Sequence, residues 1–159
     1  KDTLPLNFLT EGKRALVVGG GPGAYKKLKA LLSSQMKTKL VATEICSEIS
    51  SLESPFLEIE KRAFSDADLA DVDLAYAVTD NEELNRKIIR LAREKKILCC
   101  LADKNWSEGD VITPAVIRCG DVVISISTGG KSCTESKALR EFLEKQLEVY
   151  QKVRANESA

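Results

Sequence analysis

Short apolar runs alternate with stretches of helical periodicity along most of the chain. The apolar runs predict five strands, at residues 14–18, 39–43, 57–61, 74–78 and 97–101. Apolar residues at helical spacing predict helices over 23–34 and 80–95, and a weaker pattern predicts a short helix over 47–52. Because short connections join alternating strands and helices, we expect an α/β fold, a Rossmann-like doubly wound parallel sheet with helices on both faces.

The pattern changes after the fifth predicted strand. Residues 111–118 and 122–127 are both extended, and Cys119-Gly120-Asp121 lies between them, which predicts a β-hairpin. A long amphipathic helix follows the hairpin. We therefore expect a nucleotide-binding domain over 1–110 and a hairpin-plus-helix segment over 111–159.

Two of the predicted helices begin with the spacing of a capping box. Asp80 and Glu83 open the helix after the fourth strand, and Ser132 and Glu135 open the long C-terminal helix. In this motif the first side chain accepts a backbone N–H while the acid three residues later reaches back. We therefore expect Asp80 and Ser132 to be helix caps.

The composition excludes several classes of protein. A length of 159 residues fits one domain, or one domain with a small appendage, and 43% apolar with 30% charged residues is ordinary globular usage. Lys plus Arg and Asp plus Glu both number 24, so the net charge is zero. This balance argues against a general nucleic-acid binder or a polybasic membrane binder, although a local basic site stays open. Since no apolar run approaches about 18 residues, we expect no membrane span.

The sequence contains no histidine. A Ser-His-Asp triad, a Cys-His pair and an imidazole proton shuttle are therefore excluded within this chain, and Asp, Glu, Lys, Tyr or Cys must do any acid–base work. Demanding chemistry is better assigned to a bound cofactor. The five cysteines are odd in number and lack CxxC spacing. We expect reduced thiols, a cytoplasmic location and no resident metal site.

A glycine-rich turn directly follows the first predicted strand and precedes a helix. Residues 19–24 contain the pattern G-x-G-x-x-A. Gly19 permits a tight turn, Gly21 lets the backbone approach a pyrophosphate, and Ala24 lets the helix pack closely. The free N–H groups of the helix start favour the phosphates. The pattern predicts a dinucleotide site, and a glycine-rich turn that binds nothing is the alternative.

An acid near the end of the second strand indicates the type of dinucleotide. Glu44, with Thr43 before it, lies slightly beyond the position from which an acid holds the ribose hydroxyls of NAD. Lys37 and Lys39 are near, but no Arg occupies the strand end. We therefore favour NAD over NADP, and an ordinary acid close to a helix start is the alternative role of Glu44.

Polar residues also end the fourth and fifth strands. Thr79 and Asp80 follow the fourth strand, and Asp103 follows the fifth. Because ligands cross the carboxyl ends of the strands in open α/β sheets, we expect Thr79 and Asp80 to face the dinucleotide. A carboxylate at Asp103, on the same edge, can reach the reacting end of the cofactor. Asp103 is the natural candidate for a general base, since histidine is absent. Helix capping for Thr79 and Asp80, and a plain loop-starting role for Asp103, are the alternatives.

Several segments match a known family in order. They are Leu4-Pro-Leu, residues 12–21, Ala77-Val-Thr-Asp80 with Asn85, Thr113-Pro-Ala, and residues 126–132 (Ile-Ser-Thr-Gly-Gly-Lys-Ser). Together they resemble the precorrin-2 dehydrogenase and sirohydrochlorin ferrochelatase family of sirohaem biosynthesis, which includes the N-terminal module of multifunctional sirohaem synthase. The resemblance covers at least residues 4–148.

The resemblance implies a reaction and a site. Precorrin-2, a tetrapyrrole with eight carboxylates, loses hydride to NAD⁺ and becomes sirohydrochlorin, and many members also insert Fe²⁺. The family's key acid–base Asp maps onto Asp103. Its dinucleotide contacts map onto Pro22, Gly23, Thr43 and Glu44. It also implies a homodimer that forms through segments matching the hairpin and the region after it.

The late turn carries candidate substrate ligands. The hydroxyls of Ser127, Thr128 and Ser132 can donate hydrogen bonds to substrate carboxylates, and Lys131 adds a positive charge. Turn and cap chemistry is the alternative for the hydroxyls, and a solvated surface charge is the alternative for Lys131.

Other functions stay open at this point. The residues after Asp103 and the pair Pro22-Gly23 depart from the usual family pattern. The chain begins at Lys1 rather than Met, so we expect sequence to be missing at either end. A non-catalytic NAD-binding or NAD-sensing module, or a fragment of a larger fused protein, is therefore an alternative. A ferrochelatase that uses the same cleft, with iron as substrate, is another.

Overall fold

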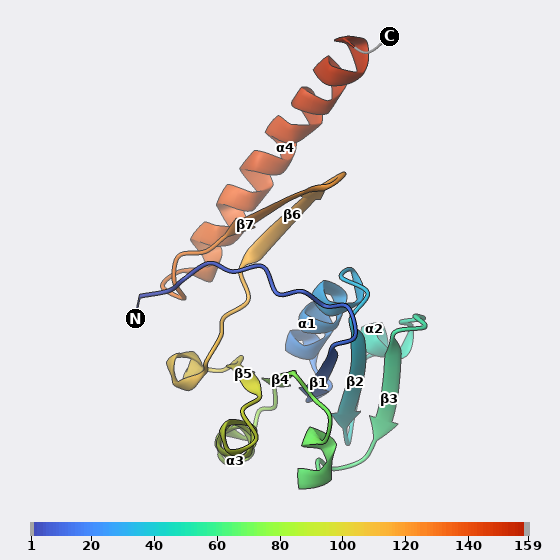
Figure 1. Cartoon of the computed structure of the whole chain (residues 1–159), viewed down its shortest axis with the longest axis vertical. Coiled ribbons are helices and arrows are strands. Elements are labelled where there is room, and N and C mark those ends of the chain that lie inside the picture. The colour runs from blue at the N-terminus through green and yellow to red at the C-terminus, as the bar shows by residue number, and fades with distance from the viewer. Residues whose placement is uncertain (1, 158–159) are drawn as a thin grey trace. The chain divides into compact units, whose positions relative to one another are not determined.

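The computed structural model describes residues 2–157, with side chains described up to Leu147 (Figure 1). The chain divides into two compact units. The first unit runs from Leu4 to Val111, and the second begins at Ile112 and includes Asp2 and Thr3.

A five-stranded parallel sheet forms the centre of the first unit, in the order β3-β2-β1-β4-β5. The strands are β1 (Arg14–Val18), β2 (Lys37–Ala42), β3 (Leu57–Lys61), β4 (Leu74–Ala77) and β5 (Leu98–Leu101). The strand order reverses beside β1, which makes the carboxyl ends of β1 and β4 the topological switch point where such sheets bind ligands. The predicted doubly wound sheet is confirmed.

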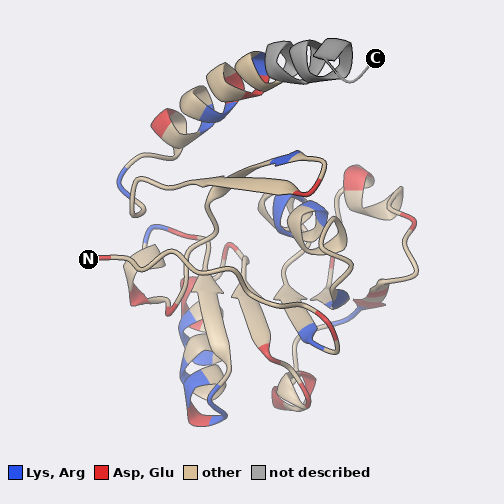
Figure 2. Ribbon diagram, turned by 45° about the horizontal axis from the view of Figure 1, so that its top comes forward, with Lys and Arg blue, Asp and Glu red and all other residues tan. Residues whose placement is uncertain are grey.

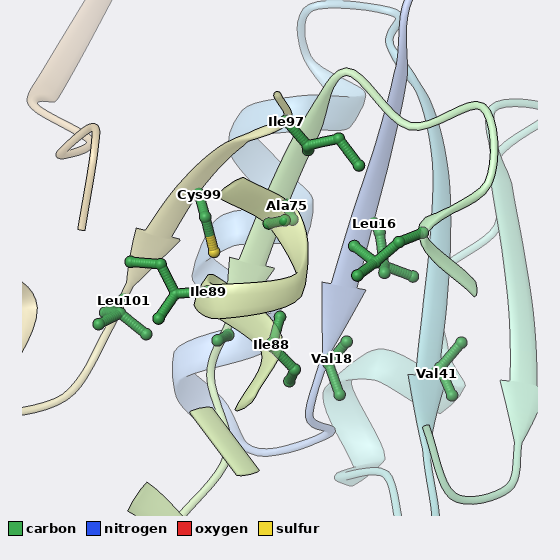
Figure 3. Close-up of a cluster of buried hydrophobic side chains, with 12 residues drawn as sticks. Leu16, Val18, Val41, Ala75, Ile88, Ile89, Ile97, Cys99 and Leu101 are labelled. Carbon is green, nitrogen blue, oxygen red and sulfur yellow. The ribbon is translucent and has the colours of Figure 1, made fainter. Parts of the chain in front are cut away.

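Helical elements cover both faces of this sheet (Figure 1). They are α1 (Pro22–Leu32), α2 (Ser47–Ser50), α3 (Glu82–Glu94) and a 3₁₀ turn, η1 (Asp66–Leu69). A second 3₁₀ turn, η2 (Trp106–Glu108), follows β5. Successive strand residues point to opposite faces. Leu16 and Val18 therefore pack with Ile88 of α3, as Figure 3 shows, whereas Val17 packs with Leu28 of α1 on the other face.

The start of α3 differs from the sequence prediction. Asp80 is not its cap: the helix begins at Glu82, and the Oδ1 of Asn81 accepts a hydrogen bond from the N–H of Leu84 at 3.0 Å. An acceptor side chain caps a helix only from the position directly before its first residue. Because β4 ends at Ala77 and the turn after it extends through Asn81, Asp80 lies one residue too early.

The second unit contains the predicted hairpin, with β6 (Ala115–Cys119) antiparallel to β7 (Val122–Ile126), followed by α4 (Cys133–Glu157). The first hairpin strand was predicted to begin at residue 111, but it begins after Pro114, which has no N–H to donate to a ladder.

Ser132 caps α4 as predicted, since its Oγ accepts the N–H of Glu135 at 3.1 Å. The other half of the capping box is replaced, because the N–H of Ser132 donates to the Oγ1 of Thr128 at 2.9 Å. The Oγ1 of Thr128 therefore accepts the hydrogen bond that the capping-box prediction gave to the Glu135 side chain.

A buried carboxylate ties η1 to the edge of the sheet. The side chain of Asp68 is almost fully buried and accepts hydrogen bonds from the Arg62 guanidinium and from the Ser65 N–H at 2.8 Å. The ammonium of Lys39 on β2 lies 3.3 Å from the same carboxylate. The Arg62 guanidinium holds the pKa of Asp68 well below its ordinary value, although burial opposes this shift.

Asp68→Asn is expected to lower the free energy of unfolding at pH 7 by about 1–3 kcal/mol, since it removes the buried charge that pairs with Arg62 and Lys39 and leaves both cations to share Glu60. Because the folded-state pKa of Asp68 is depressed, its stabilising effect is complete above about pH 4 and is lost as the pH falls toward the folded pKa. Urea unfolding of both proteins between pH 7 and pH 2 checks this, and the difference between them should narrow below about pH 4. Asp66→Asn, which affects only an exposed pair with Lys87, is the matched control. A difference that stays constant over this pH range would contradict the assignment.

Candidate functional site

Two glycines of the turn after β1 are required by close backbone packing. Gly19 has a φ of +121°, and a Cβ there would lie 2.3 Å from the carbonyl oxygen of Val78 after β4. A Cβ on Gly20 would lie 1.9 Å from the carbonyl oxygen of Glu44. The glycine turn therefore packs closely against the backbone that follows β4 on one side and β2 on the other. The sequence analysis did not single out Gly20. The run of three glycines could have indicated that this position also lacks room for a side chain.

The start of α1 is open toward an anion. Gly21 is its N-cap and Pro22 follows, no described side chain caps this helix start, and its first turn carries no acid. A Cβ added at Gly21 would meet no atom of the described residues within 4 Å. Free N–H groups and the positive helix end favour phosphate, and the open space lets it approach the backbone. These residues fit the pyrophosphate of a dinucleotide.

The loop after β2 lies against this turn. The N–H of Cys46 donates to the carbonyl oxygen of Gly20 at 2.8 Å, and the N–H of Gly19 donates to that of Val41 at 3.0 Å. Thr43 and Glu44 are both exposed between these two anchors. The structure therefore brings the candidate ribose ligands beside the glycine turn.

A buried asparagine joins the ends of β4 and β5. The Oδ1 of Asn85 accepts hydrogen bonds from the N–H and Oγ1 of Thr79, at 3.2 and 2.7 Å. Its Nδ2 donates to the carbonyl oxygen of Thr79 at 2.9 Å and to the Oδ2 of Asp103 at 2.8 Å. The Oδ1 of Asp103 accepts the N–H of Asn105 at 2.7 Å. Thr79 and Asp103 thus belong to one hydrogen-bonded cluster, while Asp80 is exposed next to it.

The loop after Asp103 is fastened to the start of α3. The ammonium of Lys104 lies 2.7 Å from the carboxylate of Glu82, and the Nδ2 of Asn105 donates to the same carboxylate at 3.3 Å. The hydrogen bond from Lys104, and then that from Asn105, lowers the pKa of Glu82. The loop after Asp103, whose sequence departs from the family pattern, is therefore tied to the first turn of α3.

The four candidate substrate residues lie in one turn of the second unit, between β7 and α4. The Oγ of Ser127 accepts the N–H of Gly129 at 3.1 Å, and Thr128 and Ser132 are joined to each other through the backbone of Ser132. Lys131 is exposed. The hydroxyls perform the turn and cap chemistry that was the alternative, and both roles are compatible.

Comparisons with known proteins bear on this arrangement. A family described as "Putative NAD(P)-binding" matches residues 6–115. The "Precorrin-2 dehydrogenase" of Bacillus subtilis is 30% identical over 146 residues, which cover 91% of this chain and 89% of that protein. The chain belongs to the precorrin-2 dehydrogenase family. The resemblance stated from the sequence is thereby confirmed.

Other members of the precorrin-2 dehydrogenase family are longer proteins. The "Siroheme synthase" of Thioalkalivibrio sulfidiphilus is 33% identical over 90% of this chain, and that of Pseudomonas aeruginosa is similar to the same extent. The chain spans about a third of the length of these synthases, 29% and 31% respectively. The solved structure of "SirC, precorrin-2 dehydrogenase" covers 91% of this chain, with a TM-score of 0.77, and the chain covers 70% of it. At 23% identity this likeness shows a shared fold.

In this precorrin-2 dehydrogenase family member, the described residues contain no helix long and apolar enough to cross a membrane. Nor do three or more Cys, Asp or Glu side chains of the described residues gather as metal ligands.

Sequence reasoning placed Asn85 in the family motif but gave it no role. Its signal was a polar residue on the apolar face of a helix, one turn before Ile88 and Ile89.

Proposed function

We propose that this chain is an NAD-dependent precorrin-2 dehydrogenase, an oxidoreductase of sirohaem biosynthesis. The single observation that carries the proposal is the carboxylate of Asp103, which Asn85 and Asn105 hold at the same sheet edge as an open dinucleotide turn. The kinship with the Bacillus subtilis enzyme over most of both chains supports the choice of substrate. The reaction removes a hydride and a proton from precorrin-2 to give sirohydrochlorin, and bound NAD⁺ supplies the hydride acceptor.

The glycine turn is proposed to hold the cofactor. Backbone N–H groups at the start of α1 bind the pyrophosphate, and the open space at Gly21 gives it room. Gly19, Pro22 and Gly23 form the rest of the turn around it. Thr79 and Asp80 line the edge beside it.

The exposed pair Thr43 and Glu44 is proposed to bind the adenine ribose. A carboxylate at Glu44 accepts hydrogen bonds from the ribose hydroxyls and repels a 2′-phosphate, which favours NAD over NADP.

Asp103 is proposed to be the general base. A hydrogen bond on each carboxylate oxygen fixes its orientation, and each oxygen keeps a further lone pair with which to accept a proton from the substrate. Because the sequence contains no histidine, a carboxylate such as that of Asp103 must accept the proton in this site.

The second unit is proposed to serve the substrate and self-association. Ser127, Thr128, Lys131 and Ser132 supply hydroxyls and a positive charge for a substrate rich in carboxylates. A homodimer through the hairpin and α4 is supported by large apolar side chains that this unit leaves exposed, namely Val122, Val123, Leu139 and Phe142. Charges of both signs lie along the described part of α4 (Figure 2).

We also propose a cytoplasmic location. The five cysteines, all among the described residues, form no disulfide, as is typical of a reducing compartment. Burial raises the pKa of the Cys99 thiol to about 12, so this thiol stays protonated at neutral pH.

Anaerobic conversion of precorrin-2 tests the function. With NAD⁺, NADH and sirohydrochlorin absorbance are expected to rise in equal amounts, and kcat/KM with NAD⁺ should exceed that with NADP⁺ by about ten-fold or more. Adding Fe²⁺ as a second substrate in the same assay shows whether sirohaem is formed. Binding of NAD without turnover would contradict the dehydrogenase and leave a non-catalytic binding module.

A further inference from the structure

We propose that Asn85 is a positioning residue that orients the Asp103 carboxylate for proton removal. The proposal rests on the proposed function, because it assigns a role within the same site. Asn85 has an exposed fraction of 0%, so it can touch neither cofactor nor substrate. Any effect on the reaction must pass through the groups to which it is hydrogen-bonded.

The hydrogen bonds of Asn85 leave one consistent orientation of its amide. The backbone N–H of Thr79 can only donate and the backbone carbonyl of Thr79 can only accept, so Oδ1 faces the first and Nδ2 faces the second. The remaining N–H of Nδ2 then points to the Oδ2 of Asp103 at 2.8 Å. Every bond that the amide can make is used, which makes its position rigid.

A purely structural role does not explain this arrangement. Asn85 lies on the buried face of α3 with Ile88, Ile89 and Ala92, where an apolar side chain would pack without the cost of burying an amide. A role limited to tying the turn at Thr79 to the helix would need only the hydrogen bonds between Asn85 and Thr79. It would leave the second N–H of Nδ2 without a purpose. The N–H directed at Asp103 links the turn after β4 to the carboxylate after β5.

Without this N–H, the hydrogen bond from the Asn105 backbone is the one that the described residues would still give the Asp103 carboxylate. The carboxylate could then rotate away from the direction in which it meets the substrate. Charged groups of α3 and of the loop after Asp103 pair with each other: Glu82 with Lys104 at 2.7 Å, and Arg86 with Glu108 at 3.4 Å. Among the described residues, the Asn85 amide is the side chain hydrogen-bonded to Oδ2 of Asp103.

Two substitutions in the full chain test the proposal. Asn85→Ser removes the donor and leaves space for water, and we expect kcat to fall about 10- to 100-fold while the Kd for NAD changes by less than about three-fold. Asn85→Asp places a second carboxyl against Asp103. Because two neighbouring carboxyls share a proton, the acid limb of the pH profile of kcat should move upward by about one pH unit or more. Both variants are needed because a buried carboxyl at position 85 can prevent folding. If Asn85→Asp does not fold, the kcat and NAD affinity of Asn85→Ser decide the proposal.

Asn81→Ala is the matched control. It removes the cap of the same helix and so loosens the start of α3 without touching Asp103, and kcat should stay within about two-fold of wild type. If Asn85→Ser retains the wild-type kcat, or if Asn81→Ala loses as much kcat as Asn85→Ser, the positioning role is wrong. A wild-type protein that binds NAD but does not turn over precorrin-2 would overturn the proposed function itself, and this role with it.

Discussion

Asp103→Asn is expected to reduce the dehydrogenation of precorrin-2 by about 10³-fold or more in kcat, while the Kd for NAD stays within about two-fold. The amide has the size of the carboxylate and keeps a carbonyl oxygen that can accept the hydrogen bond from Asn85. It cannot accept a proton at neutral pH, and general-base catalysis is typically worth about 10²- to 10⁴-fold. The variant thus separates chemistry from binding.

Single-turnover formation of NADH at saturating NAD⁺ measures the chemical step of the Asp103 variant, and calorimetric titration with NAD measures binding. Asp66→Asn is the matched control, since it makes the same chemical change at an exposed carboxylate in η1. Its kcat should equal that of wild type. Wild-type turnover in Asp103→Asn would remove Asp103 from the mechanism, and a large loss of NAD affinity would assign it to cofactor binding.

The sheet could be predicted from the sequence because its signals are local. Apolar runs mark the strands, and the order of strands and short connections leaves few parallel topologies. The position of Asp103 followed from the same reasoning, because the carboxyl ends of parallel strands share an edge. Strand limits were less certain. The second strand was predicted from residue 39, but β2 begins at Lys37, because its first three residues, Lys37-Thr38-Lys39, are polar and give no apolar signal.

The parts that could not be predicted depend on partners far apart in the sequence. Gly20 is required by the carbonyl oxygen of Glu44, and Asn85 bonds to Asp103 eighteen residues later. Helical periodicity shows that Asn85 faces inward, but it cannot show which groups it meets. The prediction of Asp80 as the cap was wrong by a single residue, because Asn81 is chemically just as suited and the length of the turn after β4 decides between them.

Gly21→Val is expected to weaken NAD binding by about 100-fold or more and to leave the fold intact. Gly21 has a φ of −85° and a ψ of −174°, which is an extended conformation that valine adopts without strain. Its Cβ would meet no atom of the described residues within 4 Å, so the free energy of unfolding should change by no more than about 1 kcal/mol. The added methyl groups would occupy the space through which a pyrophosphate reaches the backbone N–H groups of α1.

Gly20→Ala provides the contrast, because its Cβ would lie 1.9 Å from the carbonyl oxygen of Glu44, and backbone cannot yield as a flexible side chain can. That smaller substitution should cost about 3 kcal/mol or more of folding stability, by forcing the loop after β2 away from the turn. Urea unfolding of both variants, together with NAD titration of the folded Gly21→Val protein, measures the two effects. Wild-type NAD affinity in Gly21→Val would mean that the pyrophosphate is bound elsewhere. Because Gly21 faces open space and Gly20 faces backbone, one added side chain tests the cofactor site and the other tests the fold that carries it.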